Sequence, residues 1–288
     1  MSNSSSILPT IPLDQWANTF VEYITTSFSG VFEFISQVMT YVIGGFEWLL
    51  TAPPPFVIVV ILVALSWWLA NWKVAGFTCF GLLLIISLKL WEPSMLTLSL
   101  VIASTIISLL IGVPLGVLTY RSRKVKAIVK PVLDIMQTMP AFVYLIPSVL
   151  IFGLGNVTAL LATFIFAMPP AVRLTLLGLE QVPTSTLEAA EAFGASEWQK
   201  LVKVQLPLAL PMIMSGVNQV IMLSLSMVVI SSMVGAGGLG AEVLRSISLL
   251  DVGLGFIGGI SVVILAIILD RMTIINSNKS TSASGTNH

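Results

Sequence analysis

Residue types that commonly carry out catalysis or bind metals are scarce in this sequence of 288 residues. The only histidine is His288, the last residue, and the only cysteine, Cys79, lies inside an apolar run. A lone cysteine cannot form a disulfide within the chain, and a single terminal histidine argues against histidine-based catalysis and most metal sites. The sequence contains neither paired carboxylates nor a Ser–His arrangement. It therefore predicts no catalytic residue, no metal site and no enzyme activity in this chain by itself.

One glycine motif has a spacing that could serve a nucleotide. Residues 235–240, GAGGLG, match G-x-G-x-x-G through Gly235, Gly237 and Gly240. A dinucleotide site requires a strand before the motif and a helix after it, whereas this motif follows a long apolar segment. A flexible extracytoplasmic turn is the better interpretation. The pattern G-x-x-x-x-G-K-[ST] does not occur, so we do not expect ATP to bind this chain through a P-loop.

The longest run of mixed charge is PTSTLEAAEAFGASEWQKLVKVQLP, residues 183–207. Two pairs in it have the spacing of a capping box, which begins a helix: Ser185 with Glu188, and Ser196 with Gln199. The alanines favour helix, and Gly194 is suited to a left-handed helix stop. We expect two short helices at an angle, with Pro207 leading into the next apolar segment. Such a loop is suited to contact with a partner protein.

The elements that position this loop are membrane spans. Hydrophobic residues make up 56% of the chain, charged residues make up 9%, and the mean hydropathy is +1.01. Soluble proteins average roughly 45–50% apolar and about 25% charged residues. Apolar segments close to the ~20 residues that a bilayer requires predict seven spans, at about 56–72, 74–91, 94–120, 132–152, 157–179, 208–234 and 254–269. The fold class is therefore an all-α integral membrane protein, a seven-span helical bundle. The net charge of zero argues against nucleic acid as a partner.

Basic residues give the orientation because they concentrate in cytoplasmic loops. Five of the thirteen lie between the third and fourth spans: Arg121, Arg123, Lys124, Lys126 and Lys130. If this loop is cytoplasmic, eleven basic residues lie inside and only Lys89 and Arg245 lie outside. The N-terminus is therefore predicted outside and the C-terminus inside. The loop at 183–207 is then cytoplasmic.

The first fifty residues are harder to place. Residues 1–13 are predicted to be a disordered polar start without a cleavable signal. Residues 14–50 contain no basic residue, and three acidic residues fall on one side of a helical wheel: Glu22, Glu33 and Glu47. This pattern favours an amphipathic helix in the membrane interface. The alternative is a span over about 24–43, which would place Glu33 in mid-bilayer at a cost of roughly 2.5–3.5 kcal/mol. Three glycines could also break such a span: Gly30, Gly44 and Gly45.

Small residues and prolines mark candidate contacts and kinks in the bundle. A ribbon of small residues repeats every four positions in the third span and predicts close helix packing, within the protein or across a dimer: Ser104, Ser108, Gly112 and Gly116. Gly255 and Gly259 offer a weaker version in the last span. Five prolines predict kinks in spans four to six: Pro140, Pro147, Pro169, Pro170 and Pro211. Asp134 and Arg173 lie near the cytoplasmic ends of spans four and five and could pair.

Neutral polar residues occupy the deeper positions. Six of them could line a translocation path, although such groups serve helix–helix hydrogen bonds at least as often: Gln137, Thr138, Asn218, Gln219, Ser224 and Ser226. A carrier coupled to protons or ions usually keeps charged residues at mid-depth. This sequence has too few there for a proton relay, so the energy source is predicted to lie outside the chain.

The loop also carries a family signature. Glu188-Ala189-Ala190, Gly194 and Val204-Gln205-Leu206-Pro207 resemble the E-A-A-x3-G-x9-I-x-L-P signature of ABC-importer permeases, with Val204 in place of isoleucine. Four further segments are similar to the glycine betaine/proline betaine permease subfamily: 136–147, 166–178, 203–219 and 225–240. The resemblance covers roughly residues 94–273 and is highly specific at the level of the family.

This resemblance implies the transmembrane part of a type I ABC importer in the bacterial cytoplasmic (inner) membrane. Two copies of the permease would form the path, a separate extracytoplasmic binding protein would deliver substrate, and separate ATPase subunits would bind ATP with magnesium. No cofactor would bind this chain. The contact with the ATPase would involve Glu188, Ala189, Ala190, Gly194, Leu206 and Pro207.

The resemblance also suggests how the chain is divided: 1–52, an extracytoplasmic N-terminal extension with an amphipathic helix; 53–92, two accessory transmembrane helices; 93–273, a permease core of five transmembrane helices with a coupling loop at 180–206; and 274–288, a cytoplasmic polar tail.

The implied cargo is a compatible solute such as glycine betaine, proline betaine or choline. An amino acid or trimethylamine N-oxide is the alternative. A secondary carrier would need inverted repeats and mid-depth charges, and a structural scaffold would leave the capped loop unexplained.

Overall fold

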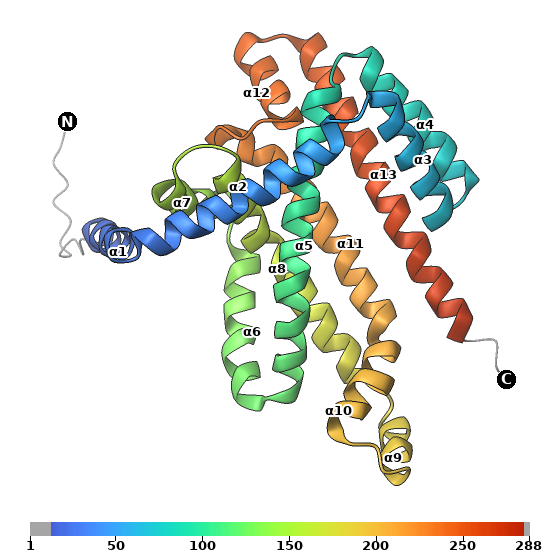
Figure 1. Cartoon of the computed structure of the whole chain (residues 1–288). Helices are drawn as coiled ribbons and strands as arrows, with labels where there is room; N and C mark the ends of the chain where they lie inside the picture. The colour runs from blue at the N-terminus through green and yellow to red at the C-terminus, as the bar shows by residue number, and fades with distance from the viewer. Residues whose placement is uncertain (1–12, 285–288) are drawn as a thin grey trace, which may run out of the picture.

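A computed structural model describes residues 13–284, and the part of the chain that it describes contains helices and turns but no strand. Three long helices form the centre of the bundle (Figure 1): α5 (Trp91–Arg121), α8 (Asn156–Glu180) and α11 (Leu206–Ile230). The all-helical fold class is confirmed. The predicted disordered start and His288 lie outside the described residues, except that α1 (Leu13–Ser27) begins at the last residue of that start.

The ribbon of small residues on α5 faces α8 of the same chain. A Cβ atom added at Gly112 would lie 2.7 Å from Cβ of Ala171, and one at Gly116 would lie 2.7 Å from Cβ of Thr175. Ser108 Oγ donates a hydrogen bond to the carbonyl of Phe164 at 3.2 Å. The predicted close packing is confirmed, and this seam lies inside one chain.

A second group of helices packs against the N-terminal end of α5. It consists of α13 (Val252–Ser284), α3 (Pro55–Leu69) and α4 (Trp72–Ser87), which lie together in Figure 1. Their shared core is apolar and buried: Ile58, Val59, Leu82, Ile85, Leu265 and Ile268. The short α12 (Leu239–Leu249) precedes α13. Of the predicted pair Gly255 and Gly259, only Gly255 is closely packed, since its added Cβ would lie 2.8 Å from Ser246 Oγ.

The span predicted over 132–152 is broken at Pro140, one of the five predicted kinks. The structure has two helices there, α6 (Arg123–Thr138) and α7 (Ala141–Phe152), which meet at a bend of 102°. Met139 is extended, with ψ of 134°, because a residue before proline avoids the helical region. The helix therefore ends before Pro140 and restarts after it.

The other predicted kinks leave their helices continuous. Pro147 lies inside α7, Pro169 and Pro170 lie inside α8, and Pro211 lies inside α11. Each proline removes one backbone donor and crowds the preceding turn. Within a bundle, neighbouring groups and small helical adjustments can accommodate that loss. Only Pro140 coincides with a break.

The N-terminal segment forms α1 and α2 (Ser29–Thr51), which run across one side of the bundle (Figure 1). The helix breaks at Phe28, whereas the predicted breaks at Gly30, Gly44 and Gly45 do not occur. Residues of α2 sort into three lengthwise stripes. One packs inward through Ile35, Met39, Ile43, Phe46 and Leu50. A second is exposed and apolar, with Val31, Phe34, Val38, Tyr41 and Trp48. The third is polar, with Glu33, Gln37, Thr40, Glu47 and Thr51. This arrangement suits the predicted interfacial helix.

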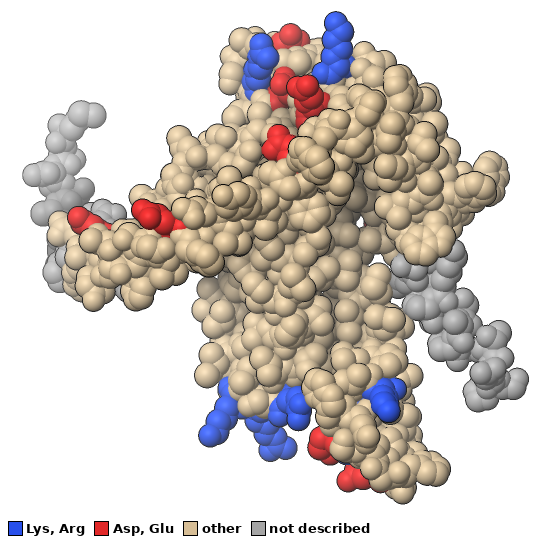
Figure 2. Space-filling view, in the orientation of Figure 1, with Lys and Arg blue, Asp and Glu red and all other residues tan. Residues whose placement is uncertain are grey.

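Four helices are long and apolar enough to cross a membrane: Trp91–Arg121, Asn156–Glu180, Glu197–Val234 and Val252–Thr273. Two bent pairs, α2 with α3 (98°) and α6 with α7, would raise the number to six. The count of seven and the orientation therefore stay predictions. In Figure 2, most charged side chains gather toward the two ends of the bundle, and further acidic patches lie on the arm at the left; the body of the bundle between the ends shows a broad uncharged band.

Candidate coupling site and translocation surface

The predicted coupling loop begins with α9 (Thr184–Ala192), which lies at one end of the molecule (Figure 1). The predicted capping box of Ser185 and Glu188 is wrong. The helix begins one residue after Pro183, and the Pro183 carbonyl accepts hydrogen bonds from the amides of Thr186 (3.1 Å) and Leu187 (3.4 Å). Because Ser185 is already helical, its side chain makes no cap. Proline fixes its own φ, so the turn into the helix does not require a polar cap.

The end of α9 at Gly194 agrees with the prediction. Gly194 has φ of +78°, in the left-handed region. Its amide donates to the Glu191 carbonyl at 2.8 Å, and the Ala195 amide donates to the Ala190 carbonyl at 3.0 Å. These two bonds form a Schellman motif, in which glycine avoids the steric cost of a Cβ atom. Glu188, Ala189 and Ala190 lie on the helix that this motif ends.

The second predicted helix is continuous with the following span. Ser196 and Gln199 form the predicted capping box, with bonds of 2.8 and 3.3 Å, and begin α10 (Glu197–Lys200). A π-helical turn, η1 (Leu201–Gln205), then joins α10 to α11 without a break, although a separate short helix was expected. The wider turn accommodates Pro207, whose ring would crowd the Lys203 carbonyl in a regular α-helix. Leu206 and Pro207 form the first turn of α11.

Lys200 joins the two helices of the loop. Its Nζ lies 3.2 Å from a carboxylate oxygen of Glu191 on α9 and 2.6 Å from one of Glu197 on α10. The Lys200 side chain is 11% exposed, whereas both carboxylates are largely exposed. The hydrogen bond to Glu197, followed by the contact with Glu191, raises the pKa of Lys200. The ammonium therefore stays charged at physiological pH and can hold α9 and α10 at a fixed angle.

The outer surface of the loop is exposed and partly apolar. None of the nine residues of α9 is buried. Phe193 is 93% exposed and Trp198 is 64% exposed. A nine-residue helix is marginal by itself in water, and an exposed aromatic pair is typical of a contact surface. The sequence reasoning missed both residues, although a Phe and a Trp in the most polar stretch of the chain were a usable signal.

The inner side of the loop is fixed to the bundle. Gln205 Nε2 donates to the Tyr120 hydroxyl at the end of α5 at 2.8 Å. Leu201 and Gln205 are buried, and a Cβ atom added at Gly178 of α8 would lie 3.1 Å from the Ala209 carbonyl. The turn after α10 is therefore packed on α5 and continuous with α11, which packs closely on α8.

Two ion pairs connect α6 to α8 beside this loop. Asp134 pairs with Arg173, as predicted, and Lys126 pairs with Glu180. Leu133 is the one buried residue of α6, so these charged contacts are a large part of its attachment. Solvent screens them because all four side chains are at least one-third exposed. α6 can consequently change its position more easily than the central helices.

Four of the six predicted path residues are exposed in the single chain: Gln137, Thr138, Gln219 and Ser226. On α11, Gln219 and Ser226 belong to a stripe at helical spacing that also contains Ser215 and Met222. A polar stripe on the surface of an apolar helix is unfavourable against lipid. It therefore indicates a neighbour of matching polarity or a water-filled path.

The other two predicted path residues bond to other helices of the chain, whereas Thr138 and Ser226 bond only to carbonyls of their own helices. Ser224 is buried, and the Thr105 hydroxyl lies 3.5 Å from its oxygen. Asn218 Nδ2 donates to Asp270 at 3.3 Å, and Thr273 Oγ1 donates to Asn218 Oδ1 at 2.9 Å. These bonds link α11 to α5 and to α13. Asp270 is thus part of a contact between helices.

The glycine-rich turn at 235–240 is fixed in place, contrary to the prediction of a flexible turn. The Gly237 amide donates to Asn156 Oδ1 at 3.0 Å, and the Leu239 amide donates to Thr97 Oγ1 at 2.8 Å. A Cβ atom at Gly240 would lie 2.6 Å from the Val229 carbonyl, so the turn is closely packed. The glycines allow this backbone packing and do not surround a nucleotide.

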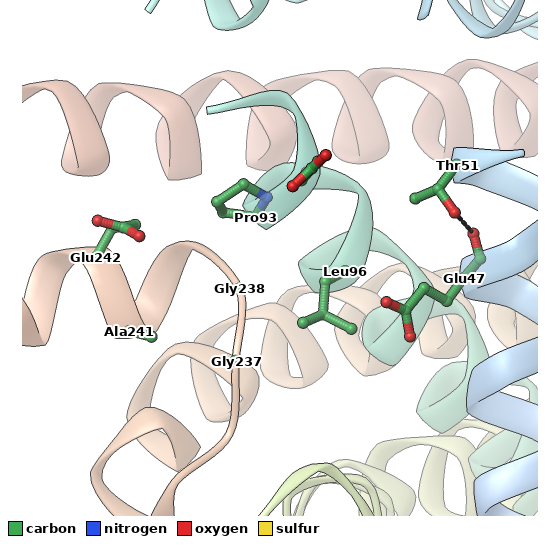
Figure 3. Close-up of a pocket in the computed structure, with 9 residues that line it drawn as sticks. Glu47, Thr51, Pro93, Leu96, Gly237, Gly238, Ala241 and Glu242 are labelled. Atoms are coloured by element: carbon green, nitrogen blue, oxygen red, sulfur yellow. Dashed lines mark hydrogen bonds between the residues drawn. The ribbon is translucent and has the colours of Figure 1, made fainter. Parts of the chain in front are cut away.

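A hollow of about 540 Å³ adjoins this turn at the end of the bundle opposite the coupling loop (Figures 1 and 3). Carboxylates from three helices line it, those of Glu47 on α2, Glu92 on α5 and Glu242 on α12. The Thr51 hydroxyl donates to the Glu47 main-chain carbonyl at 2.7 Å (Figure 3). No group of metal-binding residues occurs among the residues that the structure describes.

If this loop couples to a partner ATPase, as the family resemblance implies, we expect the Lys200 contact to affect coupling more than folding. Lys200→Met removes the charge that joins α9 to α10, so transport per ATP hydrolysed should fall about two- to fivefold, a modest effect because solvent screens the two carboxylates. Lys203→Met is the matched control, since Lys203 is exposed and forms no ion pair within the described residues. The measurement is uptake and ATP hydrolysis in the same vesicles. If the ratio of uptake to ATP hydrolysis is the same in the Lys200→Met and Lys203→Met variants, the role of Lys200 is contradicted.

Comparison with known proteins identifies relatives over nearly the whole chain. A family model described as binding-protein-dependent transport system inner membrane component matches residues 108–279. The glycine betaine/carnitine transport permease protein GbuB of Listeria monocytogenes is 48% identical, over 96% of this chain and 99% of that protein. The glycine betaine/proline betaine transport system permease protein ProW of Escherichia coli is 47% identical, over 91% of this chain and 74% of that protein. A chain of the MetNI methionine ABC transporter, in an inward-facing conformation, has a TM-score of 0.58 and 25% identity, over 69% of this chain and 97% of that chain.

Proposed function

This chain belongs to the family of binding-protein-dependent transport system inner membrane components, the permeases of ABC importers, and from this we propose that it carries glycine betaine across the inner membrane. Two close relatives, GbuB and ProW, are named for different second cargoes but share glycine betaine. Their identity to this chain, close to one-half over almost its whole length, supports a shared cargo class. Carnitine and proline betaine are quaternary ammonium compounds like glycine betaine. We therefore propose quaternary ammonium solutes as that class.

ATP hydrolysis in this family takes place in partner subunits, and a binding protein supplies the substrate. We propose that α9 and α10 dock on the ATPase, with Glu188, Ala189, Ala190 and Gly194 at the contact and Phe193 as its apolar anchor. The observation that carries this proposal is a capped helix with no buried residue, beside a phenylalanine that is 93% exposed. Magnesium and ATP would bind that partner alone.

We further propose that two copies of the chain enclose the path, lined by Gln137, Thr138, Gln219 and Ser226. Their exposure within one chain supports this assignment. Asn218 and Ser224 would instead stabilise packing, because both bond to other helices of the same chain. Residues 1–52 would lie outside, with the apolar stripe of α2 toward lipid and its polar stripe toward water, and residues 274–288 would extend into the cytoplasm.

The direct test is reconstitution of the chain with its ATPase and binding protein in vesicles. We expect ATP-dependent uptake of radiolabelled glycine betaine, with competition by carnitine and proline betaine and much weaker competition by methionine. Omission of ATP or of the ATPase should stop uptake. Uptake without ATP would indicate a secondary carrier, and strong competition by an amino acid would refute the proposed cargo.

A further inference from the structure

The α3–α4 hairpin is shorter than a normal pair of membrane spans. α3 has 15 residues and α4 has 16, so at 1.5 Å per residue they are only about 22–24 Å long. A typical hydrocarbon layer is about 30 Å thick. α5, with 31 residues, is about 46 Å long and has no such deficit.

Non-helical backbone limits both ends of the hairpin. α3 follows Pro54, whose ψ is 143°, and at its other end Ala70 and extended Asn71 form the connection to α4. α4 ends at Ser87, and Lys89, two residues later, has φ of +59°. Irregular backbone exposed to lipid does not occur within the hydrocarbon layer, because each unsatisfied polar group costs several kcal/mol. Both ends of the hairpin must therefore reach the polar headgroups.

The side chains at the tip fit a headgroup position. Trp67, Trp68 and Trp72 are 67–77% exposed, and tryptophan prefers the membrane interface. The charged Nζ of Lys73 lies 5.9 Å from the ring centroid of Trp72. Lys73 is the only charged residue between Pro55 and Ser87. A charge in mid-bilayer is strongly unfavourable, so the tip belongs at a surface.

One face of the hairpin is fixed to the protein and the other faces outward. Ser66 and Thr78 share a buried hydrogen bond of 3.0 Å between the two helices. A Cβ atom added at Gly81 would lie 2.6 Å from Ile264 of α13, so the pair is closely seated. On the outer face, Val60 and Phe80 are both 67% exposed. A fixed hairpin cannot lengthen to match the bilayer.

We propose that the α3–α4 hairpin is a lipid-facing surface that fits a hydrocarbon layer only about 22–24 Å thick, and that it locally thins the membrane beside α13. The occupant of this surface is the bilayer itself, because both ends are polar and the face between them is continuously apolar. A thicker membrane strains the hairpin. The strain passes to α13 and, through the Asn218–Asp270 contact, to α11.

Nitroxide labels test the depth of the hairpin without reference to transport. In a Cys79→Ser background, the full chain is labelled at Ala52→Cys, Phe80→Cys or Trp72→Cys in dioleoyl phosphatidylcholine vesicles. We expect labels at 52 and 72 to collide with a water-soluble nickel chelate and the label at 80 to collide mainly with oxygen. If the label at 72, like the label at 80, collides mainly with oxygen, the hairpin stops inside the bilayer. That result would overturn the proposal.

Transport in vesicles of increasing acyl-chain length tests the consequence, and this arm depends on the proposed function. Wild-type uptake should fall about tenfold between 16- and 22-carbon monounsaturated chains. A variant with one extra helical turn in α3, after Leu62, and one in α4, after Leu84, should retain uptake in the longer lipids. If uptake by the wild type and uptake by the lengthened variant depend on acyl-chain length in the same way, the proposal is overturned. If no lipid supports uptake, the proposed function fails, while the label depths still decide the position of the hairpin.

Discussion

Uptake is expected to fall at least about a hundredfold when Gly194 is replaced by tryptophan, a loss equivalent to about 2.8 kcal/mol. No heavy atom lies within 4 Å of the site where a Cβ would be added. The new side chain therefore enters the space proposed for the ATPase and leaves the packing of the chain unchanged. Glu188→Lys, which reverses a charge on the exposed surface of α9, should have a similar effect. Uptake and ATP hydrolysis of the assembled transporter are the measurements.

Two controls separate steric blocking from backbone strain. Gly194→Asn retains a small residue that tolerates positive φ, and it should keep most of the transport. Gly194→Ala introduces only the left-handed strain of roughly 1–2 kcal/mol. All variants should insert into the membrane normally and elute from size exclusion as the wild type does. Normal uptake by the tryptophan variant, with the native ATPase present, would refute the proposed coupling surface.

Folding is expected to fail in Gly116→Val. An added Cβ at this position lies 2.8 Å from the Val172 carbonyl and 2.7 Å from Cβ of Thr175, so α5 and α8 would have to separate. Overpacking of this kind costs typically 1–3 kcal/mol, and contact with backbone leaves little room for relaxation. Little folded protein should be recovered, and what remains should unfold at a lower temperature.

Gly45→Val provides the matched control for this experiment. Gly45 is also a helical glycine, but no heavy atom lies within 4 Å of its added Cβ. Both substitutions add the same side chain and lose the same backbone freedom, so a difference between them reports the contact of α5 with α8. Equal unfolding temperatures for the two variants would contradict the importance of this seam.

Features that depend on local composition were predictable from the sequence. Long apolar segments indicated α5, α8, α11 and α13, and the four-residue spacing of small side chains indicated the seam along α5. Gly194 and the Ser196–Gln199 box marked helix ends because these signals act over four or five residues. The pairing of Asp134 with Arg173 followed from the placement of both near one membrane surface.

Features that depend on competition between signals were not predictable in the same way. Ser185 has the right spacing for a cap, but Pro183 already begins the helix two residues earlier. Pro140 predicted a kink in the span at 132–152, but hydropathy does not register that Met139 leaves the helical region and that two separate helices meet there at 102°. The π-helical turn at 201–205 likewise has no hydropathy signal.

The candidate path shows a further limit. Gln219 and Asn218 are adjacent polar residues at similar depth, and composition cannot distinguish them. Their directions on α11 do: Gln219 is exposed, whereas Asn218 bonds to Asp270 of α13. Helical periodicity gives relative directions, but which face meets which neighbour depends on contacts between distant parts of the chain.

The unbroken helix from Glu197 to Val234 has a thermodynamic consequence. Its 38 residues, about 57 Å in length, place the proposed ATPase contact and the opposite surface on one continuous helix. Ligands at the two ends then bias the same tilt, and binding linkage is reciprocal. If bound nucleotide changes the affinity for a protein that docks at the far surface by some factor, docking of that protein must change the affinity for nucleotide by the same factor. Docking of a solute-loaded protein outside the cell would thus change the dissociation constant of nucleotide that is measured inside the cell.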